Sequence, residues 1–86
     1  MEVVQALLDS QLKSLKTQLE DVGIRVIIGK GKKEQWLGYV IDFTTTMTPI
    51  KVRVRYNDGV KPLTDKQAEG FQFVLRAGRF ILHKGK

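Results

Sequence analysis

Residues 35–45, QWLGYVIDFTT, are the longest extended stretch that the sequence predicts. The stretch is rich in aromatic and aliphatic residues and contains no proline. Gly38 lies in its interior, where a glycine is typical of a sharp bend or a bulge in a strand. A long strand that bends sharply is a feature of small, strongly curved barrels. Residues 35–45 therefore predict a curled sheet.

Shorter strands are predicted on both sides of this stretch. The loop GKGKK over residues 29–33 precedes it, and Asn57-Asp58-Gly59 is a strong turn signal after the next strand. Ala77-Gly78 separates the last two alternating runs and predicts a tight hairpin. Five short strands are too few for an ordinary two-sheet sandwich, so we expect a strongly bent antiparallel barrel of SH3-like form. The predicted strands cover residues 24–28, 35–45, 50–56, 71–76 and 79–84.

A helix is predicted over residues 2–22. Apolar side chains recur there every three or four residues, no Gly or Pro interrupts them, and Gly23 follows where a helix-ending glycine is expected. The stripe also fits a heptad pattern, so it serves either to pack on the rest of the domain or to pair with a second copy. Because small barrels also leave strand edges open, we expect a homo-oligomer. The positions assigned to self-association are Leu8, Leu12, Leu15 and Leu19.

The composition is that of one small folded domain. Of the 86 residues, 42% are hydrophobic and 28% are charged, which is close to the values of ordinary globular proteins. This length supports one modest core and no second domain. We therefore expect a single domain over residues 1–86 that is α+β and mainly β, with a helix at 2–22 followed by a basic barrel at 23–86.

The net positive charge lies entirely in the predicted barrel. Residues 1–22 carry a net charge of −2, whereas residues 23–86 carry 13 basic and five acidic side chains, a net charge of +8. Such an excess indicates a polyanionic partner, of which nucleic acid is the commonest inside cells. Solubility is the alternative use of surface lysines.

No catalytic or metal-binding pattern is present in the sequence. There is no cysteine, His83 is the only histidine, and the acidic residues are scattered. The GKGKK loop lacks the Lys-Ser/Thr pair and the following helix of a phosphate-binding loop. The sequence shows neither a signal peptide nor an apolar run of membrane-spanning length. We expect a soluble cytoplasmic protein that is not an enzyme, needs no cofactor and does not bind a membrane.

Cations and aromatic residues supply the candidate binding site. Lys51, Arg53 and Arg55 alternate with apolar residues, so they project from one face of a strand in a row of about 13 Å. The alternative is an edge strand that charge protects against aggregation. Trp36 follows the lysine loop and serves either to stack on bases or to fill the core. The candidate nucleic-acid-binding residues are Lys30, Lys32, Lys33, Trp36, Lys51, Arg53, Arg55, Arg76 and Arg79.

The order of a helix and five strands resembles the Sm-like proteins. Gly38, Val40, Phe43-Thr44 and Met47-Thr48 follow the spacing of the first Sm motif, and residues 75–82, LRAGRFIL, resemble the second. The resemblance implies ring assembly and a pocket for a uridine-like base. In that pocket Thr44 and Thr48 replace the acid and the amide of the family, Ala77 replaces a glycine, and Arg76 agrees.

A second resemblance is to Tudor and KOW-type barrels. It rests on residues 36–40, WLGYV, and residues 54–59, VRYNDG. The Tudor likeness implies an aromatic cage of Trp36, Tyr39 and Tyr56 for a methylated cation, which the charge of +8 disfavours. The KOW likeness implies contact with nucleic acid or a polymerase.

These observations predict a non-enzymatic, regulatory nucleic-acid-binding protein, in which a small basic barrel grips the phosphate backbone of RNA or DNA. The alternative is a protein-interaction module that docks an acidic partner protein through the basic face and oligomerises through the helix.

Overall fold

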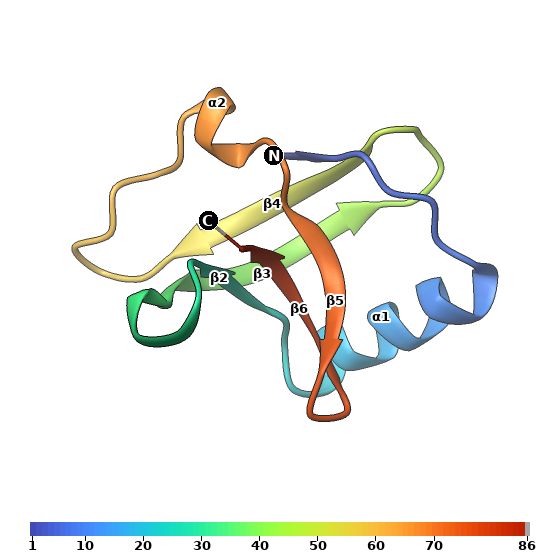
Figure 1. The fold of residues 1–86 in the computed structure, drawn as a ribbon. Coiled ribbons are helices and arrows are strands. Elements are labelled where there is room, and N and C mark those ends of the chain that lie inside the picture. Colours follow the sequence, from blue (N-terminus) through green and yellow to red (C-terminus); the bar gives the residue numbers. More distant parts are fainter. Residues whose placement is uncertain (86) are drawn as a thin grey trace.

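Six strands form one curled sheet, and a helix of 13 residues packs beside it (Figure 1). The computed structural model describes residues 1–85. A short second helix and a 3-10 turn lie in the connections. In chain order the elements are β1 (Glu2–Val3), α1 (Asp9–Asp21), β2 (Arg25–Ile28), η1 (Gly31–Lys33), β3 (Gln35–Thr44), β4 (Ile50–Tyr56), α2 (Asp65–Ala68), β5 (Gln72–Arg76) and β6 (Arg79–Lys84).

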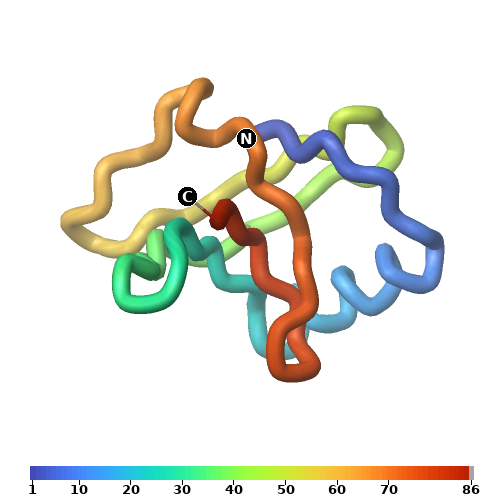
Figure 2. The backbone as a smooth tube through the Cα atoms, in the orientation of Figure 1, coloured from blue at the N-terminus to red at the C-terminus, as the bar shows by residue number. Residues whose placement is uncertain are grey.

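The strands lie in the order β1-β4-β3-β2-β6-β5. Neighbouring strands are antiparallel, except that β2 and β6 are parallel. The prediction of a curled, mainly β fold with an N-terminal helix is confirmed, but the sheet has six strands rather than five and is mixed rather than antiparallel. The sixth strand is β1, which pairs with β4. The parallel pairing follows from the long connection over residues 57–71, which sweeps round one end of the sheet (Figure 2). It carries the chain away from β4, so the β5–β6 hairpin joins the sheet beside β2.

The bend predicted at Gly38 is present in β3. The pairing of β3 shifts register on both sides of this residue, between Val26 and Ile27 of β2 and between Val40 and Asp42 of β3 itself. A Cβ atom at Gly38 would overlap the carbonyl oxygen of Arg55 on β4. Glycine therefore lets the two strands approach closely where the sheet curls.

The N-terminal helix is shorter than predicted. It begins at Asp9, and residues 2–3 instead form β1, in which Val3 pairs with Ile50 of β4 and is fully buried. The main chains of Met1 and Val52 exchange two further hydrogen bonds of 3.1 and 2.8 Å. The predicted helix thus loses about its first two turns, and Val4 and Leu8 of the apolar stripe are exposed. Pairing of Val3 with Ile50 keeps this start of the chain extended.

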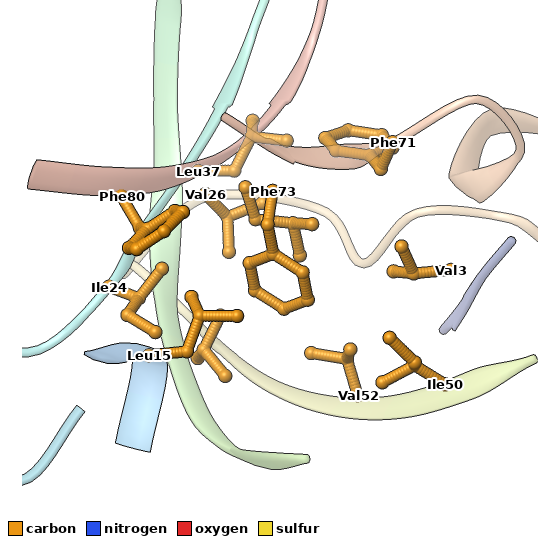
Figure 3. Close-up of a cluster of buried hydrophobic side chains, with 12 residues drawn as sticks. Val3, Leu15, Ile24, Val26, Leu37, Ile50, Val52, Phe71, Phe73 and Phe80 are labelled. Atoms are coloured by element: carbon orange, nitrogen blue, oxygen red, sulfur yellow. The ribbon is translucent and has the colours of Figure 1, made fainter. Parts of the chain in front are cut away.

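The core lies inside the curl of the sheet and is closed at one side by α1. Leu15 points from the helix toward Ile24 and Phe80 (Figure 3), and Leu19 packs against the same cluster. The helical stripe therefore packs on its own domain, which is one of the two uses that its pattern allows. The buried cluster comprises Val3, Leu15, Ile24, Val26, Leu37, Val40, Ile50, Val52, Phe71, Phe73, Phe80 and Leu82.

Two glutamine side chains attach the N-terminal part of the chain to the hairpin. The Gln5 carboxamide donates to the carbonyl of Phe73 at 2.9 Å and accepts from its N–H at 2.8 Å. The Gln18 carboxamide makes the same pair of bonds with Phe80, both 2.7 Å long, and also donates to the carbonyl of Gly23. Each side chain therefore takes the place that a peptide group of a neighbouring strand would occupy.

The β5–β6 hairpin has the tight turn that the sequence predicts. Ala77 and Gly78 adopt φ angles of 50° and 78°. Two positive φ values are typical of the turn that matches the twist of paired strands. Arg76 and Arg79 are thereby placed opposite each other at the tip.

Candidate nucleic-acid interface

The row of cations on β4 is formed as predicted. Lys51, Arg53 and Arg55 are exposed, whereas Val52 between them is buried and Val54 packs against the core. The alternation places all three cations on the outer face of the curled sheet.

The first half of the row lies among carboxylates. Arg53 forms an ion pair of 3.4 Å with Asp42, its neighbour on β3. Exposed pairs of this kind contribute little to stability, but they reduce the charge that remains for a ligand. Lys51 and Arg53 also line a cleft of about 680 Å³ with four acidic residues, namely Glu2, Asp42, Asp65 and Glu69. The positive field of the row is therefore weakest around these two residues.

Arg55 lies in a different setting. Its partner on β3 is Tyr39, and the partner of Tyr39 on β2 is Arg25, so the three residues form a line across three strands. Within residues 1–85 neither Arg25 nor Arg55 forms an ion pair. These two arginines are therefore available to an anion that approaches the outer face.

Trp36 joins this line through Tyr39. The two rings meet edge to face, with their centroids 5.3 Å apart and their planes at 89°, and the Arg25 guanidinium lies 5.2 Å from the centre of the Trp36 ring. Trp36 is 47% exposed and Tyr39 is 38% exposed. Trp36 is thus a surface residue and not part of the core. Arg25, Trp36, Tyr39 and Arg55 are called the aromatic–arginine cluster below.

The cluster is held in a fixed arrangement. The indole Nε1–H of Trp36 donates to the carbonyl of Gly38 at 3.0 Å. The Tyr39 ring lies against the main chain at Gly23, since a Cβ atom there would be 3.2 Å from Tyr39 Cδ1. The aromatic rings are therefore positioned before any ligand binds.

Arg76 is removed from the candidate surface by an ion pair. Its guanidinium donates two hydrogen bonds, of 2.7 and 3.0 Å, to the carboxylate of Glu34. These hydrogen bonds lower the pKa of Glu34 and raise that of Arg76, so the pair stays ionised at neutral pH. The sequence placed Arg76 and Arg79 with the β4 row, but the structure commits Arg76 to Glu34. Arg79 lines a separate groove beside α1, with Lys13 and Asp21.

The lysine loop forms the 3-10 turn η1. Lys30, Lys32 and Lys33 are exposed, and the loop leads directly into the start of β3, where Trp36 lies. Glu34 connects the end of the loop to the β5–β6 hairpin through Arg76. The three lysines therefore stand beside the aromatic–arginine cluster in the chain, although they are not members of it.

The residues at the Sm motif positions do not gather into one pocket. Thr44 ends β3 and is paired with Lys51, whereas Arg76 is bound to Glu34, just before the opposite end of β3 (Figure 1). The aromatic cage is also incomplete, because Tyr56 packs against the core and its hydroxyl accepts a hydrogen bond from the Leu63 N–H. Neither the base pocket that the Sm likeness implies nor the aromatic cage that the Tudor likeness implies is assembled by these residues.

The helix leaves few of its apolar residues for self-association. Leu15 is fully buried and Leu19 is packed against the core, whereas Leu8 is 69% exposed and Leu12 is half-buried. In this fold Leu15 and Leu19 are not free to contact a second copy. Oligomerisation stays a prediction that depends on Leu12 of α1 and on Leu8, which directly precedes the helix.

The sequence alone did not single out Arg25. The signal that could have identified it is the alternation of Ile24, Arg25 and Val26, which places the arginine on the outer face of β2. Its proximity to Trp36 depends on the shift in register between β2 and β3, which no local pattern reveals.

Three further searches concern metal sites, membrane-spanning helices and similarity to known proteins. No cluster of His, Cys, Asp and Glu residues within residues 1–85 could hold a metal ion. In the same part of the chain, no helix has the length and apolar character needed to cross a membrane. Comparison of the chain with protein-family models, with curated proteins and with solved structures gives no match.

Proposed function

We propose that this protein binds nucleic acid through the outer face of β2, β3 and β4, and that it does so without catalysing a reaction. The observation that carries the proposal is the line of Arg25, Tyr39 and Arg55 across three strands, with both arginines exposed and without ion pairs among residues 1–85. Like charges on one face repel each other, and a phosphate backbone relieves that repulsion.

Lys51 and Arg53 extend the same face along β4. The row from Lys51 to Arg55 is about 13 Å long, which allows contact with a few successive phosphates. The Asp42 carboxylate leaves Arg53 partly neutralised, so Arg25 and Arg55 contribute most of the attraction. The exposed lysines of η1 add to the positive field near the start of β3.

Anisotropy of a labelled oligonucleotide of about 15 nucleotides tests this function. Single-stranded RNA, single-stranded DNA and duplex DNA are compared at about 50 mM and about 200 mM salt. We expect binding that weakens steeply with salt, because each contacted phosphate releases a counterion. Failure of all three nucleic acids to bind at the lower salt concentration would refute the proposal.

Matched charge variants locate the site. The double variant Arg25→Glu/Arg55→Glu is expected to lose affinity by at least about tenfold at the lower salt concentration. The control Lys13→Glu/Lys16→Glu makes the same change in net charge at two exposed residues of α1, away from the outer face of β2–β4. Equal losses in the two variants would mean that net charge, and not this face, accounts for the binding.

The fold is compatible with the small barrels that the sequence resembles. A curled, mainly β sheet with an N-terminal helix supports a relationship to Sm-like or KOW-type barrels, in a cytoplasmic setting where nucleic acid is the available polyanion. The mixed sheet departs from the antiparallel order expected of them. Proteins that share a fold can bind different ligands, so the proposal rests on the residues of the outer face.

A protein partner is the second candidate function. Leu8, Val22 and Leu75 are exposed apolar residues, and Val22 and Leu75 line the groove between α1 and the β5–β6 hairpin. In this function an acidic protein docks on the basic face while the apolar residues support self-association. A complex that persists after nuclease treatment, together with a dimer or ring in ultracentrifugation, would favour it.

A further inference from the structure

We propose that the aromatic–arginine cluster is a stacking site for an unpaired nucleobase, so that the protein prefers single-stranded nucleic acid to a duplex. The inference rests on the proposed function and specifies single-stranded nucleic acid as the ligand of the same face. It concerns the surface of β2, β3 and β4 and does not use the Sm motif positions Thr44, Thr48 and Arg76.

The aromatic surface of the cluster is exposed and rigid. Nearly half of Trp36 is exposed, although the ring is anchored by its hydrogen bond to Gly38 and by its edge-to-face contact with Tyr39. Trp36 and Tyr39 thus form an exposed pair of neighbouring rings, whereas Phe71 and Phe73 are buried in the core. Rings that are fixed before binding lose little conformational entropy when a flat ligand stacks on them.

The charges around the rings favour a ligand that carries both a base and a phosphate. Arg25 lies over the Trp36 ring, and Arg55 lies beside Tyr39 on the next strand. An arginine in such a position stacks on a base with its planar face and donates hydrogen bonds to a phosphate with its N–H groups. A nucleotide that stacks on the rings would thus have a cation on either side for its backbone.

The shape of the site disfavours a duplex. The bases of a duplex are stacked on one another, and only their edges are open to the grooves. Trp36 and Tyr39 lie on strand β3 of a curled sheet. Within residues 1–85 they are not on a helix that could enter a groove of the duplex. Unpaired bases expose their faces, and aromatic residues on a sheet bind these faces with little dependence on sequence.

Trp36 provides a direct readout, because it is the one tryptophan of the sequence. Its fluorescence is recorded during titration with an unlabelled thymidine oligonucleotide of about 15 nucleotides, and separately with a duplex of the same length. We expect saturable quenching by the single strand and little change with the duplex. The dissociation constant for the single strand should be at least about tenfold lower than that for the duplex, since each stacked base contributes about a five- to 150-fold gain in affinity.

Variants of Tyr39 separate stacking from charge. Tyr39→Ala should weaken binding of the single strand by about fivefold or more and leave binding of the duplex unchanged, whereas Tyr39→Phe keeps the ring and should bind like the wild type. Should Tyr39→Ala fail to fold, Trp36→Ala provides a second test by anisotropy of a labelled strand, and it should likewise weaken binding of the single strand and leave binding of the duplex unchanged. Circular dichroism verifies the fold of each variant.

The outcomes distinguish this inference from the proposed function. Equal affinity for the single strand and the duplex, without a change in Trp36 fluorescence, would overturn the stacking site and leave nucleic-acid binding intact. Equal losses for both ligands in Tyr39→Ala would also overturn it, because the ring would then act only on the structure of the face. Absence of binding to either ligand would overturn both proposals.

Discussion

A glutamine side chain ends in the same carboxamide group that a peptide bond contains, and Gln5 and Gln18 use it as a neighbouring strand would. Gln5 occupies the edge of β5 at Phe73, and Gln18 occupies the main chain of β6 at Phe80. Both bonds of each pair are short and partly buried, so the loss of a carboxamide leaves main-chain groups without a partner. Gln5 thereby links the segment that follows β1, at one edge of the sheet, to β5 at the other edge, and Gln18 links α1 to β6.

Substitution of Gln18 tests this role. Gln18→Ala should lower the free energy of unfolding by about 1–3 kcal/mol, because the N–H and the carbonyl of Phe80 lose their partners. Gln18→Glu should destabilise as well at neutral pH, because a carboxylate still accepts from the N–H but meets the carbonyls of Phe80 and Gly23. Urea unfolding measures both effects.

The control for this prediction is Gln72→Ala, an exposed residue of β5. Its stability should stay within about 0.5 kcal/mol of the wild type. If Gln18→Ala were equally neutral, the carboxamide would not be holding the helix to the hairpin.

At the scale of elements, the N-terminal helix shows what the sequence could and could not predict. Its apolar spacing identified a helix and Gly23 identified its end, since both signals are local. Its start at Asp9 was missed because it depends on the pairing of Val3 with Ile50, residues that are far apart in the sequence. The parallel pairing of β2 with β6 was missed for the same reason, whereas the hairpin turn at Ala77-Gly78 was predicted correctly.

The inward packing of α1 makes a second prediction. Leu15→Ala should cost about 2–5 kcal/mol of stability, because this side chain is fully buried among core residues. Leu8→Ala removes the same atoms from a side chain that is 69% exposed and should cost less than about 0.5 kcal/mol. Chemical denaturation of the two variants provides the comparison. Similar losses in both would contradict the position of the helix.

The ion pair between Glu34 and Arg76 joins the loop before β3 to the β5–β6 hairpin and predicts a dependence of stability on pH. The pKa of Glu34 is lowered in the folded protein by its hydrogen bonds to Arg76. The ionised carboxylate therefore stabilises the folded state above the usual glutamate pKa, and this contribution is lost as the pH falls through the lowered value. Glu34→Gln should lower the melting temperature at about pH 7 and have no such effect at about pH 2.

Glu20→Gln is the control for the ion pair, because Glu20 is an exposed residue of α1. It should change the melting temperature little at either pH. A deficit of Glu34→Gln that persisted unchanged at low pH would show that the charge of Glu34 is not the cause.

At the scale of the whole molecule, some basic side chains are neutralised by nearby carboxylates and others are not. The sequence correctly predicted the exposed row on β4, because alternation in a strand determines which side chains share a face. It could not predict that Arg76 is bound to Glu34 or that Arg53 is paired with Asp42, since these contacts depend on register and on the path of loops. The arginines left without ion pairs beside Trp36 and Tyr39 define a smaller site than the sequence suggested.

Nuclear magnetic resonance can show whether nucleic acid binds to the outer face of β2, β3 and β4. Amide shifts are mapped while a single-stranded oligonucleotide of about ten nucleotides is added. We predict that the largest shifts fall on Arg25, Tyr39 and Arg55 and on the indole N–H of Trp36. Shifts confined to α1 and the β5–β6 hairpin, or no shifts at all, would contradict binding at this face.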